Sequence, residues 1–197
     1  MTASALDPRI EAASSEREAH GASPTAPSGA TAADRVSCRA MSRLALKHDD
    51  YPDASKKHLD DAEVLDRAGR SDGCAYHTGY VVECAFKSLL LHEASWDAPA
   101  GKHDPVKLRN AEGSVETLGH RIDDLFDALN RVCALATARS AKYVPATLPP
   151  KVASTWRASL RYSQPGRVNA VVSKQMLSEA KQIYAQTVGQ MRLDGVL

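Results

Sequence analysis

Residues 72–92 read DGCAYHTGYVVECAFKSLLLH, and this stretch decides the fold of the chain. It is apolar almost all the way round a helix, which is typical of a helix buried at the centre of a domain. It nevertheless contains Glu83 and Lys87, one turn apart and in the order that favours an ion pair. Burying either charge is costly without a partner. Tyr76 and Tyr80 lie on the same stripe, so the stripe is either an internal polar network or the wall of a cleft.

Helical periodicity continues through the rest of the chain after Tyr51. A first helix, capped by Asp53 or Ser55, is expected to run to Ala68. Further helices are expected at residues 72–92, 118–139, 151–162 and 168–191. Residues 93–116 are expected to form a long loop, and no segment alternates convincingly as a strand. The sequence therefore predicts an all-α fold, an antiparallel bundle of about five helices.

Residues 1–50 differ in composition from the rest and are expected to be a low-complexity extension, with residues 51–197 forming the domain. Ala, Ser, Thr, Gly and Pro dominate Met1–Arg35, which has almost no large apolar side chain to bury. Such a composition predicts disorder. A misplaced start codon would produce the same kind of upstream segment, and both interpretations stay open.

The overall composition restricts the kinds of partner. A formal net charge of +1 gives no global field, so contact with nucleic acid would need a local basic patch. The four cysteines are scattered and no secretory signal precedes them, which predicts reduced thiols and a cytoplasmic protein. No apolar run is long enough to cross a bilayer, so no membrane association is expected.

Three stretches carry a family resemblance: HLDDAEVLDRAGRSDGCAYHTGYVVECAFKSLL (58–90), LGHRIDDLF (118–126) and WRASLRY (156–162). In content and order they resemble the HEPN family of prokaryotic helical domains. The resemblance implies a helical bundle that often dimerises. It also implies a metal-independent RNase of toxin–antitoxin or phage-defence systems, or the companion of a small nucleotidyltransferase.

The chain departs from the catalytic members of that family. These carry an Arg followed within a few residues by a His, late in the domain. Here Arg161 is followed by YSQPGRVNAVV, which contains no His. The spacing also occurs from Arg70 to His77 and from Arg43 to His48, but one spans a turn between helices and the other precedes the domain.

His120 and Arg161 are the candidate catalytic residues. His120 is either a general base or a residue that orders the start of its helix. Arg161 either complements a helix dipole or binds phosphate. In an up-down bundle the start of one helix and the end of the next lie at the same end, so both residues are predicted to approach Glu83 and Lys87. Such a cluster has excess positive charge, which suits a phosphate-bearing ligand.

Three functions stay open. The first is a HEPN-like domain that binds RNA, a nucleotide-type ligand or a nucleotidyltransferase partner without cutting. Its candidate ligand-binding residues are Tyr76, Tyr80, Glu83, Lys87 and Tyr162. The second is an active metal-independent RNase that uses His120 and Arg161, and the third is a dimerisation or adaptor module. No metal or cofactor is predicted, because the sequence has no His-x-x-x-His, Gly-rich phosphate loop or nucleophile elbow.

Overall fold

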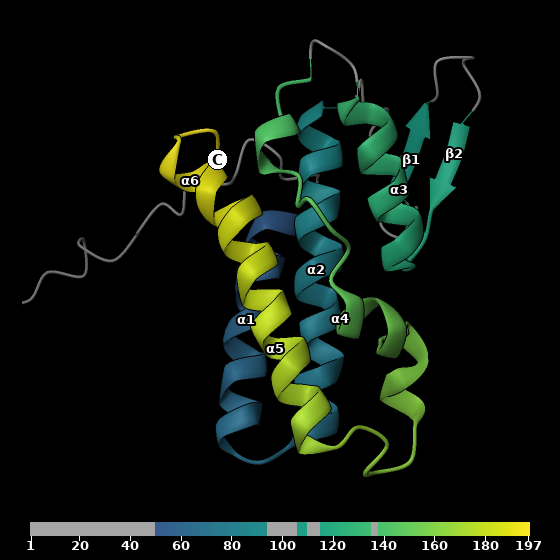
Figure 1. Ribbon diagram of the computed structural model, residues 1–197, viewed down its shortest axis with the longest axis vertical. Helices are drawn as coiled ribbons and strands as arrows, with labels where there is room; N and C mark the ends of the chain where they lie inside the picture. Colours follow the sequence, from purple (N-terminus) through teal and green to yellow (C-terminus); the bar gives the residue numbers. More distant parts are fainter. Residues whose placement is uncertain (1–49, 94–105, 110–114, 135–137) are drawn as a thin grey trace, which may run out of the picture. The chain divides into compact units, whose positions relative to one another are not determined.

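The structure, a computed structural model, describes residues 50–93, 106–109, 115–134 and 138–197 (Figure 1). The expected N-terminal extension, except Asp50, and the greater part of the expected 93–116 loop lie outside these ranges. The described part is mostly helical, and its helices pack against one another as an antiparallel bundle. This confirms the predicted fold class.

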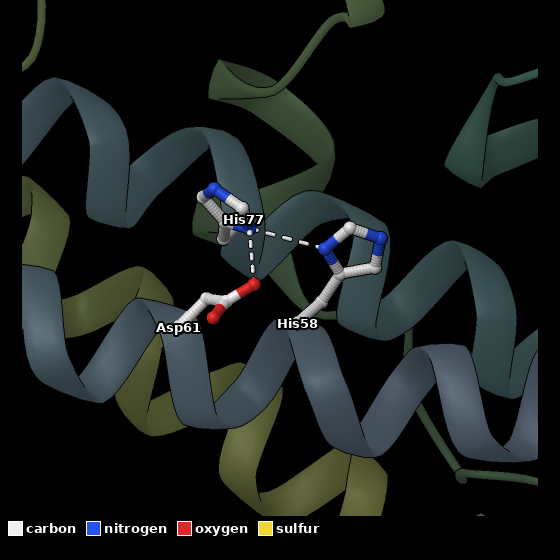
Figure 2. A group of neighbouring side chains, drawn as sticks. All are labelled: His58, Asp61 and His77. Carbon is white, nitrogen blue, oxygen red and sulfur yellow. Dashed lines mark hydrogen bonds and ion pairs between the residues drawn. The ribbon is translucent and has the colours of Figure 1, made fainter.

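The first two helices, α1 (Tyr51–Arg67) and α2 (Ser71–Glu93), run antiparallel and pack side by side (Figure 1). Asp50 caps α1 by accepting a hydrogen bond from the Asp53 amide at 3.1 Å, so the cap lies before the residues that the sequence suggested. Gly69, with φ +68°, provides the left-handed turn that reverses the chain. The pairing places His58 of α1 opposite His77 of α2 (Figure 2).

The central position of α2 is confirmed. Every residue from Val81 to Leu91 is buried, including the two charged ones. Its neighbours are α1, α3 (Ile122–Cys133), α4 (Pro150–Thr155) and α5 (Ala170–Tyr184). Over residues 81–91 the helix has no face left for water, which explains its apolar sequence on all sides there.

A short β-hairpin lies where the sequence predicted only loop. Strands β1 (Val106–Arg109) and β2 (Val115–Leu118) pair antiparallel, with Val106 opposite Leu118. The loop interpretation of residues 93–116 is therefore wrong where the strands lie. β1 does alternate, as Val-Lys-Leu-Arg, but a run of four residues is the shortest that can signal a strand, and β2, Val-Glu-Thr-Leu, alternates less regularly. The third helix accordingly begins at Ile122 rather than at Leu118, and it ends at Cys133 rather than near Arg139.

The predicted helix over residues 151–162 is two elements. α4 ends at Thr155, the backbone is extended at Trp156, and a 3₁₀ helix, η2 (Ala158–Tyr162), follows. The break turns the Trp156 side chain into the core, where it is 1% exposed. The N-terminus of α4 has no cap of its own; Glu179 of α5 accepts hydrogen bonds from the Lys151 and Val152 amides, each at 2.9 Å.

The C-terminal helix follows the prediction closely. α5 starts behind Asn169, which accepts from the Val172 amide at 2.9 Å, and continues through a π-helical turn, η3 (Ala185–Gly189), into α6 (Gln190–Leu193). A 3₁₀ turn, η1 (Ala141–Tyr143), is attached to this end through hydrogen bonds from Lys142 and Tyr143 to Asp194. Among the helices described, none has the length and apolar character that a bilayer-crossing segment requires.

Candidate functional site

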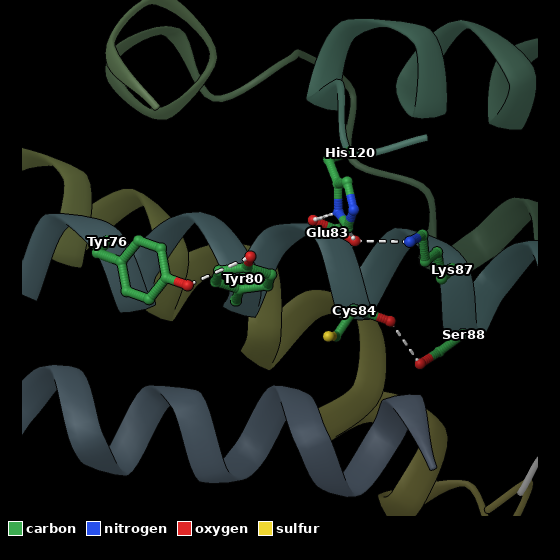
Figure 3. A network of polar contacts seen from close by, with 7 residues as sticks. All are labelled: Tyr76, Tyr80, Glu83, Cys84, Lys87, Ser88 and His120. Carbon is green, nitrogen blue, oxygen red and sulfur yellow. Dashed lines mark hydrogen bonds and ion pairs between the residues drawn. The ribbon is translucent and has the colours of Figure 1, made fainter. Parts of the chain in front are cut away.

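Glu83, Lys87 and His120 form one connected polar group (Figure 3). The Lys87 ammonium lies 2.6 Å from Glu83 Oε1, and His120 Nδ1 lies 3.0 Å and 3.1 Å from the two carboxylate oxygens. The Glu83 and Lys87 side chains are 4% and 6% exposed, whereas His120 is 59% exposed. The stripe on α2 is thus a buried ion pair that reaches the surface through one imidazole.

The hairpin positions His120 over α2. Leu118 at the end of β2 and Ile122 at the start of α3 are both buried, and the exposed segment between them carries the imidazole. A carboxylate only accepts hydrogen bonds, so Nδ1 bears the proton in the bond to Glu83. In the neutral ring, the lone pair is then on Nε2, which is the atom a general base would use.

Glu83 remains ionised in this setting. Burial alone would raise its pKa, but the hydrogen bond from His120 and the ammonium of Lys87 together hold the pKa below its usual value. An ionised carboxylate behind an imidazole fixes its tautomer and stabilises the imidazolium that forms when the ring takes up a proton. The arrangement is therefore suited to acid–base chemistry at His120.

Tyr80 and Tyr76 continue the polar stripe toward the start of α2. The Tyr76 hydroxyl donates to the Tyr80 hydroxyl at 3.4 Å, and the Tyr80 ring centroid lies 6.4 Å from that of His120 (Figure 3). Burial and the hydrogen bond from Tyr76 raise the pKa of Tyr80 far above its ordinary value. Tyr80 is therefore a neutral hydroxyl that separates two charged ends of the stripe.

Arg161 belongs to the other end of the stripe. Its side chain hydrogen-bonds that of Tyr76, which raises the Arg161 pKa, and the guanidinium lies 4.7 Å from the Tyr162 ring centroid. Tyr76 precedes Glu83 by seven residues, roughly 10 Å along the helix axis. Among the described residues no hydrogen bond or ion pair joins Arg161 to Glu83 or His120.

The prediction that four side chains converge is therefore met by three of them, and Arg161 is connected through the tyrosines. The cause is the extended backbone at Trp156, which directs η2 along the first half of α2. Tyr162 is 77% exposed and touches none of the buried group, so its predicted ligand contact would have to be made at the surface.

A cleft of about 580 Å³ lies beside Arg161, between the α1–α2 turn, η2 and the segment that leads into α5. Arg70 and Tyr76 also line it. Asp72 lies at the edge of the cleft. Its carboxylate oxygens accept hydrogen bonds from the Gly166 and Val168 backbone amides. Neither arginine is ion-paired with a carboxylate in the part of the chain that the structure describes, so the cleft is basic.

Sequence reasoning missed a second group of side chains. His58, Asp61 and His77 offer ligand atoms that all lie within 4.8 Å of one another. The interval from His58 to Asp61 is a helical i,i+3 spacing and was a usable signal. From the sequence, His77 stood out only through its RNase-like spacing from Arg70. In the structure its side chain points toward α1 and contacts His58.

No family model matches the chain, and neither a curated protein nor a solved structure matches it. The likeness to HEPN domains therefore depends on the three sequence stretches alone.

Proposed function

We propose that this protein binds a phosphate-bearing ligand, single-stranded RNA or a nucleotide, in the cleft between Arg70 and Arg161. The observation that carries the proposal is that two arginines from distant parts of the chain line one cleft. Its one lining carboxylate, Asp72, is hydrogen-bonded to backbone amides rather than paired with either arginine. Guanidinium groups bind phosphate oxygens in pairs of parallel hydrogen bonds, and they do so best where no acid competes.

Aromatic groups beside the cleft support RNA over an inorganic anion. The Arg161 guanidinium lies over one side of the exposed Tyr162 ring, and Tyr76 lines the cleft wall. Aromatic rings and guanidinium planes are the surfaces on which unpaired bases stack. The polar stripe of α2 continues from the cleft to His120. This distance is longer than a single bound nucleotide would span, which also favours RNA.

Fluorescence anisotropy with a labelled single-stranded RNA tests the proposal, with unlabelled ATP as competitor to compare a mononucleotide. Arg161→Ala and Arg70→Ala should each weaken binding by about tenfold or more, because each removes a charge-assisted hydrogen bond. Each should also lower the slope of log K against log salt by about 1.

Arg192→Ala is the matched control. It removes the same charge, but Arg192 is ion-paired with Asp53 near the start of α1, away from the α1–α2 turn that borders the cleft. Its RNA affinity should equal that of wild type. Equal affinity in all three variants, or no RNA or nucleotide binding by wild type, would contradict the proposal.

Cleavage of the bound RNA is the second candidate function, and the Glu83–His120 contact favours it. His120 Nε2 would take the proton of a ribose 2′-hydroxyl as that oxygen attacks the adjacent phosphorus. The 5′-oxygen then leaves with the electron pair of its bond to phosphorus and takes a proton from water, which produces a 2′,3′-cyclic phosphate and a 5′-hydroxyl end. Arg161 would hold a neighbouring phosphate rather than the reacting one, because Tyr76 places it two turns away.

Cleavage of 5′-labelled RNA in the presence of EDTA tests this reaction. His120→Ala and Glu83→Gln should each abolish cleavage while RNA still binds. His92→Ala, at the end of α2, should cut like wild type. If wild type does not cut but binds RNA through Arg70 and Arg161, the protein is a binding domain without catalysis.

We also propose partners and a cellular setting for this protein. The HEPN resemblance supports a homodimer, a nucleotidyltransferase partner and a role in a toxin–antitoxin or defence system. The free thiols of Cys74, Cys84 and Cys133 are consistent with a cytoplasmic location. Sedimentation of the purified chain, alone and with a co-expressed nucleotidyltransferase, tests the partners. A complex with such an enzyme and no RNA affinity would favour the adaptor function.

A further inference from the structure

Two helices bring three metal-ligating side chains to one point (Figure 2). His58 and Asp61 project from the same face of α1, and His77 projects from the facing side of α2. His58 Nδ1 and His77 Nδ1 are 3.0 Å apart, and His77 Nδ1 is 3.7 Å from Asp61 Oδ2. Facing helices of a bundle are a common place for metal sites.

The two distances at His77 suit a shared cation. Two ligand atoms about 2.0–2.1 Å from Zn²⁺, across a tetrahedral angle, lie roughly 3.3 Å from each other. The two separations at His77 fall on either side of that value. Without an ion, one imidazole must donate to the other, and the carboxylate receives only a long contact from His77.

The surroundings keep the imidazoles in position. The His58 ring is stacked on Tyr80 with centroids 5.0 Å apart, and His77 packs edge-on against Tyr76 at 5.5 Å. The His77 side chain is 24% exposed and that of Asp61 is 42% exposed, so an ion can reach the group from solvent.

We infer that His58, Asp61 and His77 bind a divalent first-row transition metal ion, with Zn²⁺ as the best-suited probe. Two imidazoles and one carboxylate are a donor set used by Zn²⁺ and by Fe²⁺. Three protein ligands leave one position for water or a second ligand, which distinguishes the site from a closed structural zinc site. The inference is independent of the proposed RNA binding.

Lys57 is the group that competes with the ion. Its ammonium lies 3.7 Å from Asp61 Oδ2, the same oxygen that faces His77. The Lys57 side chain is 73% exposed, so the contact is weak and the chain is free to move into solvent. The metal therefore displaces an ammonium group from Asp61 without disturbing the packing of the helices.

Calorimetric titration of the full chain with Zn²⁺, after treatment with a chelator and without RNA, tests the inference. One equivalent should bind and raise the melting temperature. His58→Gln, His77→Gln and Asp61→Asn should each weaken binding by at least about tenfold. Lys57→Gln should bind Zn²⁺ as tightly as wild type or more tightly.

His92→Gln and His120→Gln are the matched controls, because they remove histidines outside the group, and both should bind Zn²⁺ like wild type. Asp61→Asn keeps the shape of a partly exposed side chain, so it remains informative if a histidine variant fails to fold. Absence of saturable Zn²⁺ binding by wild type, or unchanged affinity in Asp61→Asn, would overturn the inference.

Discussion

The indole of Trp156 lies directly on the backbone of Gly79. A β-carbon added to Gly79 would come within 3.0 Å of three atoms of the Trp156 side chain. The indole Nε1 also donates to the Tyr76 carbonyl at 3.0 Å. Glycine in the middle of a helix lowers helix stability by about 1 kcal/mol relative to alanine. At position 79 this loss makes room for the indole ring. The contact fixes where the chain leaves α4, and with it the position of Arg161.

Gly79→Ala should therefore destabilise the protein, although alanine is the better helix former. The added methyl group overlaps a fully buried ring, and overpacking of this kind costs about 3 kcal/mol. Urea unfolding at neutral pH measures the change. RNA affinity should fall as well, because the displaced indole carries η2 with it.

Gly73→Ala is the control for helix propensity. The three atoms nearest to its β-carbon would all belong to the Leu65 side chain, the closest at 3.2 Å, and that side chain can shift. The stability of Gly73→Ala should lie within about 1 kcal/mol of wild type. A Gly79→Ala protein as stable as Gly73→Ala would mean that the indole is not held where the structure places it.

Lys87→Met should cost about 3 kcal/mol of unfolding free energy, because it leaves the Glu83 carboxylate buried without its ammonium partner. Adding Glu83→Gln to Lys87→Met should recover part of the loss, since no uncompensated charge remains. Chemical denaturation of the single and double variants measures the coupling. Lys56→Met is the control: its pair with Asp60 has the same spacing but is exposed, so its removal should cost less than about 0.5 kcal/mol.

Acid should destabilise wild type more steeply than Glu83→Gln. The pKa of Glu83 is lower in the folded protein than its ordinary value of 4.5, so the unfolded chain takes up the proton first as the pH falls. The stabilisation by the ionised carboxylate is complete above about pH 4.5 and is lost progressively as the pH decreases through the folded-state pKa. The unfolding free energies of the two proteins, measured at intervals from neutral pH downward, should differ by a constant amount near neutral pH and converge in the acid range. Parallel curves would show that Glu83 has the same pKa in both states.

Asp72→Ala should release the segment that borders the cleft before α5. It removes the acceptor for the Gly166 and Val168 amides, at a cost of about 1–2 kcal/mol for partly exposed charge-assisted bonds. Hydrogen exchange at these two amides should accelerate, and RNA binding should weaken because the cleft loses one wall. Asp72→Asn retains one acceptor oxygen, so its exchange rates should be intermediate. Unchanged exchange in Asp72→Ala would contradict this role.

Local sequence signals were sufficient for the main helices. The apolar stretch of α2 predicted its central position, and Gly69 marked the turn after α1. They were insufficient where a distant contact decides the backbone. Nothing in residues 151–162 indicates a break, because the break at Trp156 depends on the space that Gly79 leaves on another helix.

The candidate sites show the same difference between contacts that local sequence predicts and contacts that depend on distant packing. Glu83 and Lys87 were paired by their spacing on one helix, and His120 was expected nearby from the bundle topology. The meeting of His58 with His77 instead depends on the register between α1 and α2. Packing sets that register, including the buried hydrogen bond from Ser55 to the Val81 carbonyl. Neither residue's own neighbourhood in the sequence contains that information.

The cap that Glu179 provides for α4 makes the cleft depend on α5. α4 has six residues, too few for a helix that is stable in isolation, and its first amides are bonded to a carboxylate of α5. Its helical form therefore depends on contact with α5. The segment that follows α4 holds Trp156 and Arg161, so local opening of α5 should displace the guanidinium that lines the cleft. Binding should then be lost before the rest of the bundle unfolds.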